Sequence, residues 1–250
     1  MLTRHRGSST LTPLVSALFV GFGGLVTGGV LVAAVAVGLE SIGFQVFDNL
    51  ALAVGVTVVM QGIGFAIVAV AYLRYHDLGV EFIRLRMPRR SDVLWIGGGL
   101  VGLFGLLTVI NVLLQLVGLG NVAQHELARL GQQQPVLFLI LVPLSVLIIG
   151  PGEELLFRGI IQTRLVEAYS TNIGIIVTSA IFASAHFPAY GGENVAVAIV
   201  VLFVLSIVLG WIYEKTDNLV VPVVVHGLYD AVQFFTLYIL ILIELSVLFH

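Results

Sequence analysis

The sequence predicts an all-α fold, a polytopic transmembrane helical bundle of seven or eight helices with polar residues inside the membrane. Of its 250 residues, 59% are hydrophobic and only 10% are charged, and the mean hydropathy is +1.11. A soluble domain carries roughly 25% charged residues, and a soluble protein of this composition would expose too much apolar surface. The same hydrophobicity excludes a disordered chain.

The net charge and the absence of cysteine exclude further classes of protein. The formal net charge is −3, so we expect no nucleic-acid partner, because nucleic-acid binding needs a basic patch. The chain has no cysteine, which excludes disulfides, thiolate metal sites and a cysteine nucleophile. We see no repeat, linker or second domain and therefore expect residues 1–250 to form a single membrane domain.

Apolar segments long enough for membrane helices, which need about 20 residues, follow one another along the chain. They are residues 14–39, 50–73, 93–119, 136–165, 172–187, 194–213 and 219–249. The last is either one tilted helix or two segments broken near Gln233, which leaves the count at seven or eight. The first is too long for the hydrophobic part of a signal peptide, about 7–15 residues, so we expect an uncleaved anchor.

Lysine and arginine predict the orientation, because they concentrate in cytoplasmic loops. With a cytoplasmic N-terminus, all of the 11 Lys and Arg residues except Arg129 lie on the inner side. We therefore expect an integral protein of the cell membrane, in contact with membrane lipids, with its N-terminus in the cytoplasm. The basic segment 81–90 then lies in a cytoplasmic loop, where we expect it to rest on anionic headgroups.

Two glycine pairs have the spacing that lets membrane helices approach closely. They are Gly24 with Gly28, and Gly98 with Gly102. The alternative interpretation is that these glycines are simply tolerated, as glycine often is in membrane helices.

Ionisable residues inside the predicted spans are the strongest pointers to function. Each costs at least ~2.5–3.5 kcal/mol at the centre of a membrane helix, so such residues usually mark a functional site. The residues concerned are Glu153, Glu154, Arg158, His186, His226, Asp230 and Glu244. All except Glu244 fall into three short patterns with helical spacing.

The first pattern is the sequence from Glu153 to Arg158. Glu154 and Arg158 are four residues apart and can form an ion pair on one face of a helix. Glu153 points about 100° away from that face, so it is left as an unpaired carboxylate in apolar surroundings, the setting of a general base. The alternative is that both glutamates are solvated at a cytoplasmic helix end.

The other two patterns each contain a histidine. His186 ends an apolar helix, and Phe182, one turn earlier, could hold its ring; alone, it is typical of a packing histidine. His226 and Asp230 are four residues apart and could bind a metal together, or Asp230 could orient the imidazole. The alternative for this pair is a buried hydrogen bond between helices.

Taken together, the three patterns favour one shared intramembrane site. Three helices each supply polar groups in a chain that otherwise avoids them. We expect the site to contain Glu153, His186, His226 and Asp230, with Phe182 and the Glu154–Arg158 pair in support.

These motifs resemble those of a known group of membrane proteins. Glu-Glu-x-x-x-Arg, Phe-x-x-x-His and His-x-x-x-Asn/Asp occur here in this order on successive spans, as in the CPBP group. That group includes the type II CAAX prenyl endopeptidases (Rce1-like) and the bacterial Abi or bacteriocin-immunity proteins. The resemblance covers residues 136–235, which we expect to be the catalytic core; the first 130 residues match only as generic membrane helices.

The resemblance implies an intramembrane endopeptidase that cleaves membrane-anchored or lipidated, CAAX-type peptides or proteins, with its site nearer the cytoplasmic side. Glu153 would activate water together with His186, and His226 with Asp230 would stabilise the oxyanion. Members of the family are commonly labelled metalloproteases. Glu153, His186 and His226 could form a His₂Glu site for a divalent metal such as zinc, or act without a metal.

Asp230 departs from the prenyl peptidases, which typically carry Asn at this position. An Asn amide donates a hydrogen bond, whereas an ionised Asp cannot donate and would repel an oxyanion. Asp230 would therefore have to be protonated, bind a cation or orient His226. This difference weakens the transfer of prenyl-CAAX specificity to the chain.

Other classes of intramembrane protease lack their motifs here. His125-Glu126 is not followed by the second histidine of a His-Glu-x-x-His site, and the chain has neither a Gly-x-Ser-Gly sequence nor a second Asp within a span. The remaining alternative is a non-enzymatic membrane protein of the Abi or bacteriocin-immunity type, a transporter or a scaffold.

Overall fold

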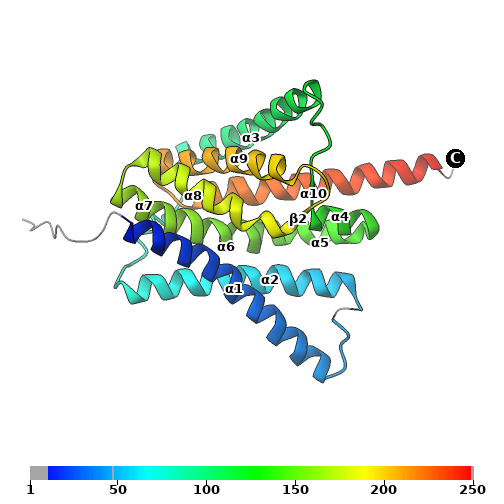
Figure 1. Ribbon diagram of the computed structural model, residues 1–250, viewed down its shortest axis with the longest axis horizontal. Coiled ribbons are helices and arrows are strands. Elements are labelled where there is room, and N and C mark those ends of the chain that lie inside the picture. The colour runs from blue at the N-terminus through cyan, green and yellow to red at the C-terminus, as the bar shows by residue number, and fades with distance from the viewer. Residues whose placement is uncertain (1–10, 47, 249–250) are drawn as a thin grey trace, which may run out of the picture.

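The computed structural model describes residues 11–46 and 48–248, which form the predicted all-α bundle (Figure 1). Almost every element is helical. Two segments, η1 and η2, are π-helical, and η3 is a 3₁₀ turn. The elements in chain order are α1 Thr12–Ser41, α2 Leu50–Tyr75, α3 Arg90–Leu116, β1 Gln124–His125, α4 Glu126–Gln133, α5 Val136–Leu144, η1 Ser145–Ile149, α6 Gly150–Glu154, η2 Leu155–Gln162, α7 Thr163–Ala168, α8 Thr171–Ala185, η3 Phe187–Ala189, β2 Tyr190–Gly191, α9 Val195–Thr216 and α10 Val220–Leu248.

Within the described residues, seven helical segments are long and apolar enough to cross a membrane, and the protein is an integral membrane protein. Each lies close to a segment predicted from hydropathy. The last, α10, continues without a break through Gln233 and extends beyond the rest of the bundle (Figure 1). Arg4 and Arg6, which contribute to the predicted orientation, lie outside the described residues, and that orientation stays a prediction.

The fourth span, residues 136–168, is one continuous helical segment built from α5, η1, α6, η2 and α7. Pro143 and Pro151 lie inside it, and proline cannot donate the backbone hydrogen bond of a regular helix. The π-helical segment η1 follows Pro143, and η2 follows α6. Such wider turns occur frequently at functional sites, since they alter which face of the helix a side chain occupies. Here they flank the Glu153–Glu154 pair.

Glycines let neighbouring backbones touch α6 on two sides. A Cβ atom on Gly150 would lie 2.9 Å from the backbone nitrogen of Gly227 in α10, and one on Gly152 would lie 3.1 Å from the Cα atom of Gly62 in α2. Membrane helices pack closely where such small residues meet. This packing places α6 next to the turn of α10 that carries His226.

The two glycine pairs predicted from spacing behave differently. A Cβ on Gly64 would lie 2.5 Å from the Cα atom of Gly28, so Gly28 lies at a backbone contact between α1 and α2, and Gly24 is equally crowded by side chains. Around Gly98 and Gly102, no atom beyond the chain neighbours and the surrounding backbone of the same helix lies within 4 Å of the position of an added Cβ. The first pair is therefore a helix contact, and the second fits the alternative of tolerated glycines.

The basic segment 81–90 is bound to its own chain. Arg84 forms an ion pair of 2.9 Å with Glu214 of α9, and Arg86 forms one of 2.7 Å with Asp92 of α3. Arg86 also donates to the carbonyl oxygen of Thr216. These two arginines therefore tie together the ends of α3 and α9, and the contact of segment 81–90 with headgroups stays a prediction.

A small antiparallel sheet lies towards the opposite end of the bundle (Figure 1). It consists of β1 and β2, with Gln124 opposite Gly191 and His125 opposite Tyr190. The pair connects the chain between α3 and α4 to the chain that follows α8. It therefore ties a loop of the N-terminal half to the end of the helix that carries His186.

Candidate functional site

The structure brings together the four residues predicted to share a site. Glu153 comes from α6, His186 caps the C-terminus of α8, and His226 and Asp230 lie on successive turns of α10. The Oε1 atom of Glu153 is 3.6 Å from Nε2 of His186, and its Oε2 atom is 3.8 Å from Nε2 of His226. Oδ2 of Asp230 is 3.4 Å from the same Nε2 of His226. Two imidazoles and two carboxylates thus converge inside the bundle.

His186 is oriented by the turn of helix that precedes it. Its Nδ1 atom is 2.8 Å from the carbonyl oxygen of Phe182, and the two rings lie 4.4 Å apart. Because a carbonyl only accepts, Nδ1 must carry a proton and donate it. In the neutral ring, Nε2 then presents its lone pair towards Glu153.

His226 is oriented by Glu154, a contact that sequence spacing does not reveal. Nδ1 of His226 donates to Oε1 of Glu154 at 2.8 Å. The other oxygen of Glu154 lies 3.2 Å from Nε of Arg158, which is the predicted ion pair. Glu154 therefore links Arg158 to the site, and Nε2 of His226 is left facing Glu153 and Asp230.

Arg158 is enclosed on all sides. Its Nη2 atom donates to the hydroxyl of Ser206 on α9 at 3.1 Å, and its guanidinium lies 4.9 Å from the ring centre of Phe182. Phe182 in turn touches His186, so one aromatic ring contacts both the supporting cation and an imidazole of the site. Phe182 thus packs between them, as its position one turn before His186 suggests.

The side chains of the two glutamates differ in how deeply they are buried. The side chains of Glu154 and Arg158 are 0% exposed, whereas those of Glu153 and Asp230 are 12% and 21% exposed. Glu153 is therefore partly accessible, whereas Glu154 is not. The structure shows one paired, enclosed carboxylate and one accessible carboxylate, which is the division that the i,i+4 spacing predicts.

The donor set resembles that of a zinc site in chemistry. Metal-binding histidines commonly donate their other ring nitrogen to a carbonyl or a carboxylate, as His186 and His226 do. Within residues 11–46 and 48–248, however, no three His, Cys, Asp or Glu side chains are arranged so that they could hold a metal ion. As placed, the residues do not fit the metal, and the zinc site formed by Glu153, His186 and His226 stays a prediction.

Two further residues, which the sequence patterns did not identify, lie near the site. His125 and Tyr190 face each other across the β1–β2 pair, with ring centres 5.2 Å apart. Burial and the nearby His186 lower the pKa of His125 to about 4. Burial, with the nearby carboxylates Asp230 and Glu153, raises the pKa of Tyr190 to about 12. No spacing rule links these loop residues to the three helical motifs.

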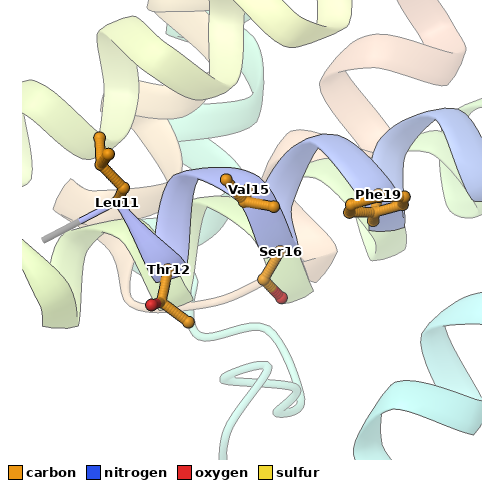
Figure 2. A pocket seen from close by; sticks show the side chains of 5 residues that line it. All are labelled: Leu11, Thr12, Val15, Ser16 and Phe19. Carbon is orange, nitrogen blue, oxygen red and sulfur yellow. The ribbon is translucent and has the colours of Figure 1, made fainter. Parts of the chain in front are cut away.

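The remaining surface features lie apart from this cluster. Glu244, on the exposed C-terminal part of α10, belongs to none of the contacts described above. Figure 2 shows a hollow on one face of α1 that contains no residue of the cluster. It is lined by Leu11, Thr12, Val15, Ser16 and Phe19.

Comparison with known proteins agrees with the motifs. Residues 135–232 match the family model described as type II CAAX prenyl endopeptidase Rce1-like. Over 86 residues, the chain is 37% identical to the uncharacterized protein YpbD of Bacillus subtilis, a stretch that covers 34% of this chain and 40% of that relative. No solved structure matches the chain significantly.

The matched segment contains all three motifs and every residue of the cluster. The resemblance predicted from those motifs is therefore confirmed over residues 135–232, which are similar to the Rce1-like family of type II CAAX prenyl endopeptidases.

Proposed function

We propose that the protein is an intramembrane endopeptidase that hydrolyses peptide bonds of membrane-associated substrates. The observation that carries the proposal is the accessible carboxylate of Glu153, which lies between the Nε2 atoms of two imidazoles at 3.6 and 3.8 Å. The family match of residues 135–232 supports a protease of the CAAX type. The placement of the site residues on helices apolar enough to cross a membrane supports a reaction within the membrane.

Glu153 acts as the general base. Its distances to both imidazoles exceed a direct hydrogen bond, so its oxygens are free to accept a hydrogen bond from water. His186 shares this work, because its proton is held on Nδ1 and the lone pair of Nε2 faces the same region. Together they orient one water molecule and take up its proton.

His226 stabilises the oxyanion. Glu154 accepts from Nδ1 of this ring and Asp230 lies beside Nε2, so in this proposal the ring is a doubly protonated imidazolium whose Nε2–H is directed into the site as a donor. A donor placed where negative charge develops is worth several kcal/mol in the transition state. Asp230, at 3.4 Å from this Nε2, acts as a positioning residue that keeps the proton on that nitrogen.

The proposed reaction balances as an ordinary amide hydrolysis. The water oxygen forms a bond to the carbonyl carbon as Glu153 takes its proton, and the carbonyl oxygen becomes an oxyanion held by His226. The carbon–nitrogen bond then breaks, and the proton on Glu153 passes to the leaving amine. The products are a carboxylic acid and a free amine, which exchange a proton at neutral pH to give a carboxylate and an ammonium group.

The substrate class we propose is a peptide or protein attached to the membrane by a lipid or a helix. Prenylated CAAX peptides are the first candidate substrates, because the matching family is named for them. The aspartate at position 230 makes a wider substrate range worth testing. We also propose that the N-terminus is cytoplasmic and that the site is reached from within the cell membrane, nearer its cytoplasmic side.

The test is cleavage by protein purified in detergent, with a panel that contains a farnesylated CAAX peptide and an unmodified single-span peptide. We expect cleavage by the wild type and none by Glu153→Gln, which keeps the shape of the side chain but removes its basicity. Glu193→Gln is the matched control, because Glu193 is an exposed carboxylate outside the spans. Metal analysis of the same preparation tests the predicted zinc site.

Two outcomes would overturn the proposal. Cleavage by Glu153→Gln at the wild-type rate would remove Glu153 from the role of base. Failure of the folded wild type to cleave any peptide would favour the non-enzymatic alternative of an immunity protein, transporter or scaffold.

A further inference from the structure

The β1–β2 pair holds an imidazole and a phenol beside the proposed active site. Tyr190 follows His186 after a single 3₁₀ turn, which rises about 2 Å per residue, so the two residues are about 8 Å apart along the chain axis. His125 lies directly opposite Tyr190 in the sheet and packs its ring against it. Charges on Glu153, His186 and Asp230 act on His125, and charges on Glu153 and Asp230 act on Tyr190.

The hydrogen bonding of His125 defines which of its ring nitrogens carries the proton. Nδ1 accepts a hydrogen bond of 3.1 Å from the backbone N–H of Leu127 and so caps the N-terminus of α4. Since Nδ1 accepts, the neutral ring must carry its proton on Nε2. No described group accepts a hydrogen bond from this Nε2 atom. With a pKa of about 4, the ring is neutral at physiological pH and Nε2–H is a donor that does not lose its proton.

We propose that His125 is a substrate-binding residue, whose Nε2–H donates to a backbone carbonyl of the peptide bound at Glu153. The role rests on the proposed endopeptidase function, since the carbonyl would belong to the peptide being cleaved. A neutral donor suits this substrate-binding role, because a neutral imidazole binds a carbonyl without adding positive charge beside His186. Tyr190 fixes the position of the ring through the β1–β2 pair.

The competing explanation is that His125 only caps α4. Two substitutions separate the explanations, because each keeps one of the two ring nitrogens. Asn places its side-chain oxygen near the position of Nδ1 and is a favoured N-cap residue, but it lacks a group at Nε2. Gln places its amide nitrogen near the position of Nε2 and keeps the donor, but it is a poor cap.

The first measurement is steady-state cleavage of the best peptide of the panel by the two variants. We expect His125→Asn to lower kcat/KM about tenfold, mostly through a higher KM, as loss of one hydrogen bond implies. His125→Gln should stay within about threefold of the wild type. Gln124→Ala is the control, because Gln124 is exposed on the same strand. The opposite order, or equal effects of Asn and Gln, would overturn the proposal.

The second measurement does not depend on cleavage. In the Glu153→Gln background, binding of a dansyl-labelled farnesylated CAAX peptide is followed by fluorescence anisotropy in detergent. Weaker binding with His125→Asn but not with His125→Gln supports the role of His125, even if the wild type cleaves nothing and the proposed function fails. Equal binding by both variants would contradict it.

Discussion

Substitution of Arg158 by methionine tests whether the enclosed ion pair supports the site. The side chain is 0% exposed, and its Nε atom lies 3.2 Å from Glu154, which is also 0% exposed. Arg158→Met preserves much of the volume but leaves Glu154 buried without its cation. Breaking a buried pair on one side destabilises proteins by ~3–5 kcal/mol, because the remaining charge loses its partner.

The structure puts the expected loss at the lower end of that range. Glu154 keeps its 2.8 Å hydrogen bond from His226, so the carboxylate is not left wholly without a partner. We expect a loss of about 3 kcal/mol. In a protein of 150–250 residues, each kcal/mol lowers Tm by about 2–4 °C, so Tm should fall by about 6–12 °C.

The assay is thermal unfolding in detergent, with a matched arginine as control. Arg164 lies on the same span and forms an exposed pair of 3.1 Å with Glu167, so Arg164→Met should cost less than about 1 kcal/mol. The double variant Glu154→Gln with Arg158→Met should recover most of the loss, because neither charge of the pair remains. A single variant as stable as Arg164→Met, or a double variant no better than the single, would refute the reasoning.

Three further predictions concern the site, the helix contacts and the β1–β2 pair. Asp230→Asn should keep activity in the cleavage assay, because the amide oxygen still accepts from Nε2–H of His226 and the side chain no longer repels the oxyanion; joint loss of activity and bound metal would instead identify a ligand. Gly64→Ala should destabilise the protein by about 1–3 kcal/mol in thermal unfolding, since its Cβ meets the backbone of Gly28, whereas Gly98→Ala should change stability by less than about 1 kcal/mol. Stability should fall as pH is lowered from about 6.5 to about 4, because His125 then binds a proton in the unfolded chain but stays neutral in the folded protein, where its pKa is about 4. His125→Asn should flatten this part of the pH profile of stability. A profile that the substitution leaves unchanged would contradict the lowered pKa.

The positions of the spans follow from the sequence alone, because hydropathy and helix length are local properties. Each apolar run became a helix with ends within a few residues of those expected, and only the continuity of α10 had to come from the structure. The Glu154–Arg158 pair and the His226–Asp230 contact follow in the same way, since residues four apart meet on one face of any helix.

Contacts between elements could not be predicted with the same rules. Two glycine pairs share one spacing, yet only Gly28 meets another backbone, while Gly98 lies in open space. The spacing of the glycines shows that one face of a helix carries small residues, but it does not show which other helix, if any, packs against that face. In a membrane, lipid is as apolar as the helices, so composition does not reveal which faces are buried.

The sequence by itself determined the fold class, the motifs and which glutamate is paired and which is available. Only the tertiary structure decided that Glu154, rather than Asp230, orients Nδ1 of His226, and that the β1–β2 pair brings His125 to the site from a loop. Both contacts join residues far apart in the chain, over 60 or more positions, where no helical periodicity connects them. Their geometry depends on close packing between helices and between loops, which local sequence patterns do not encode.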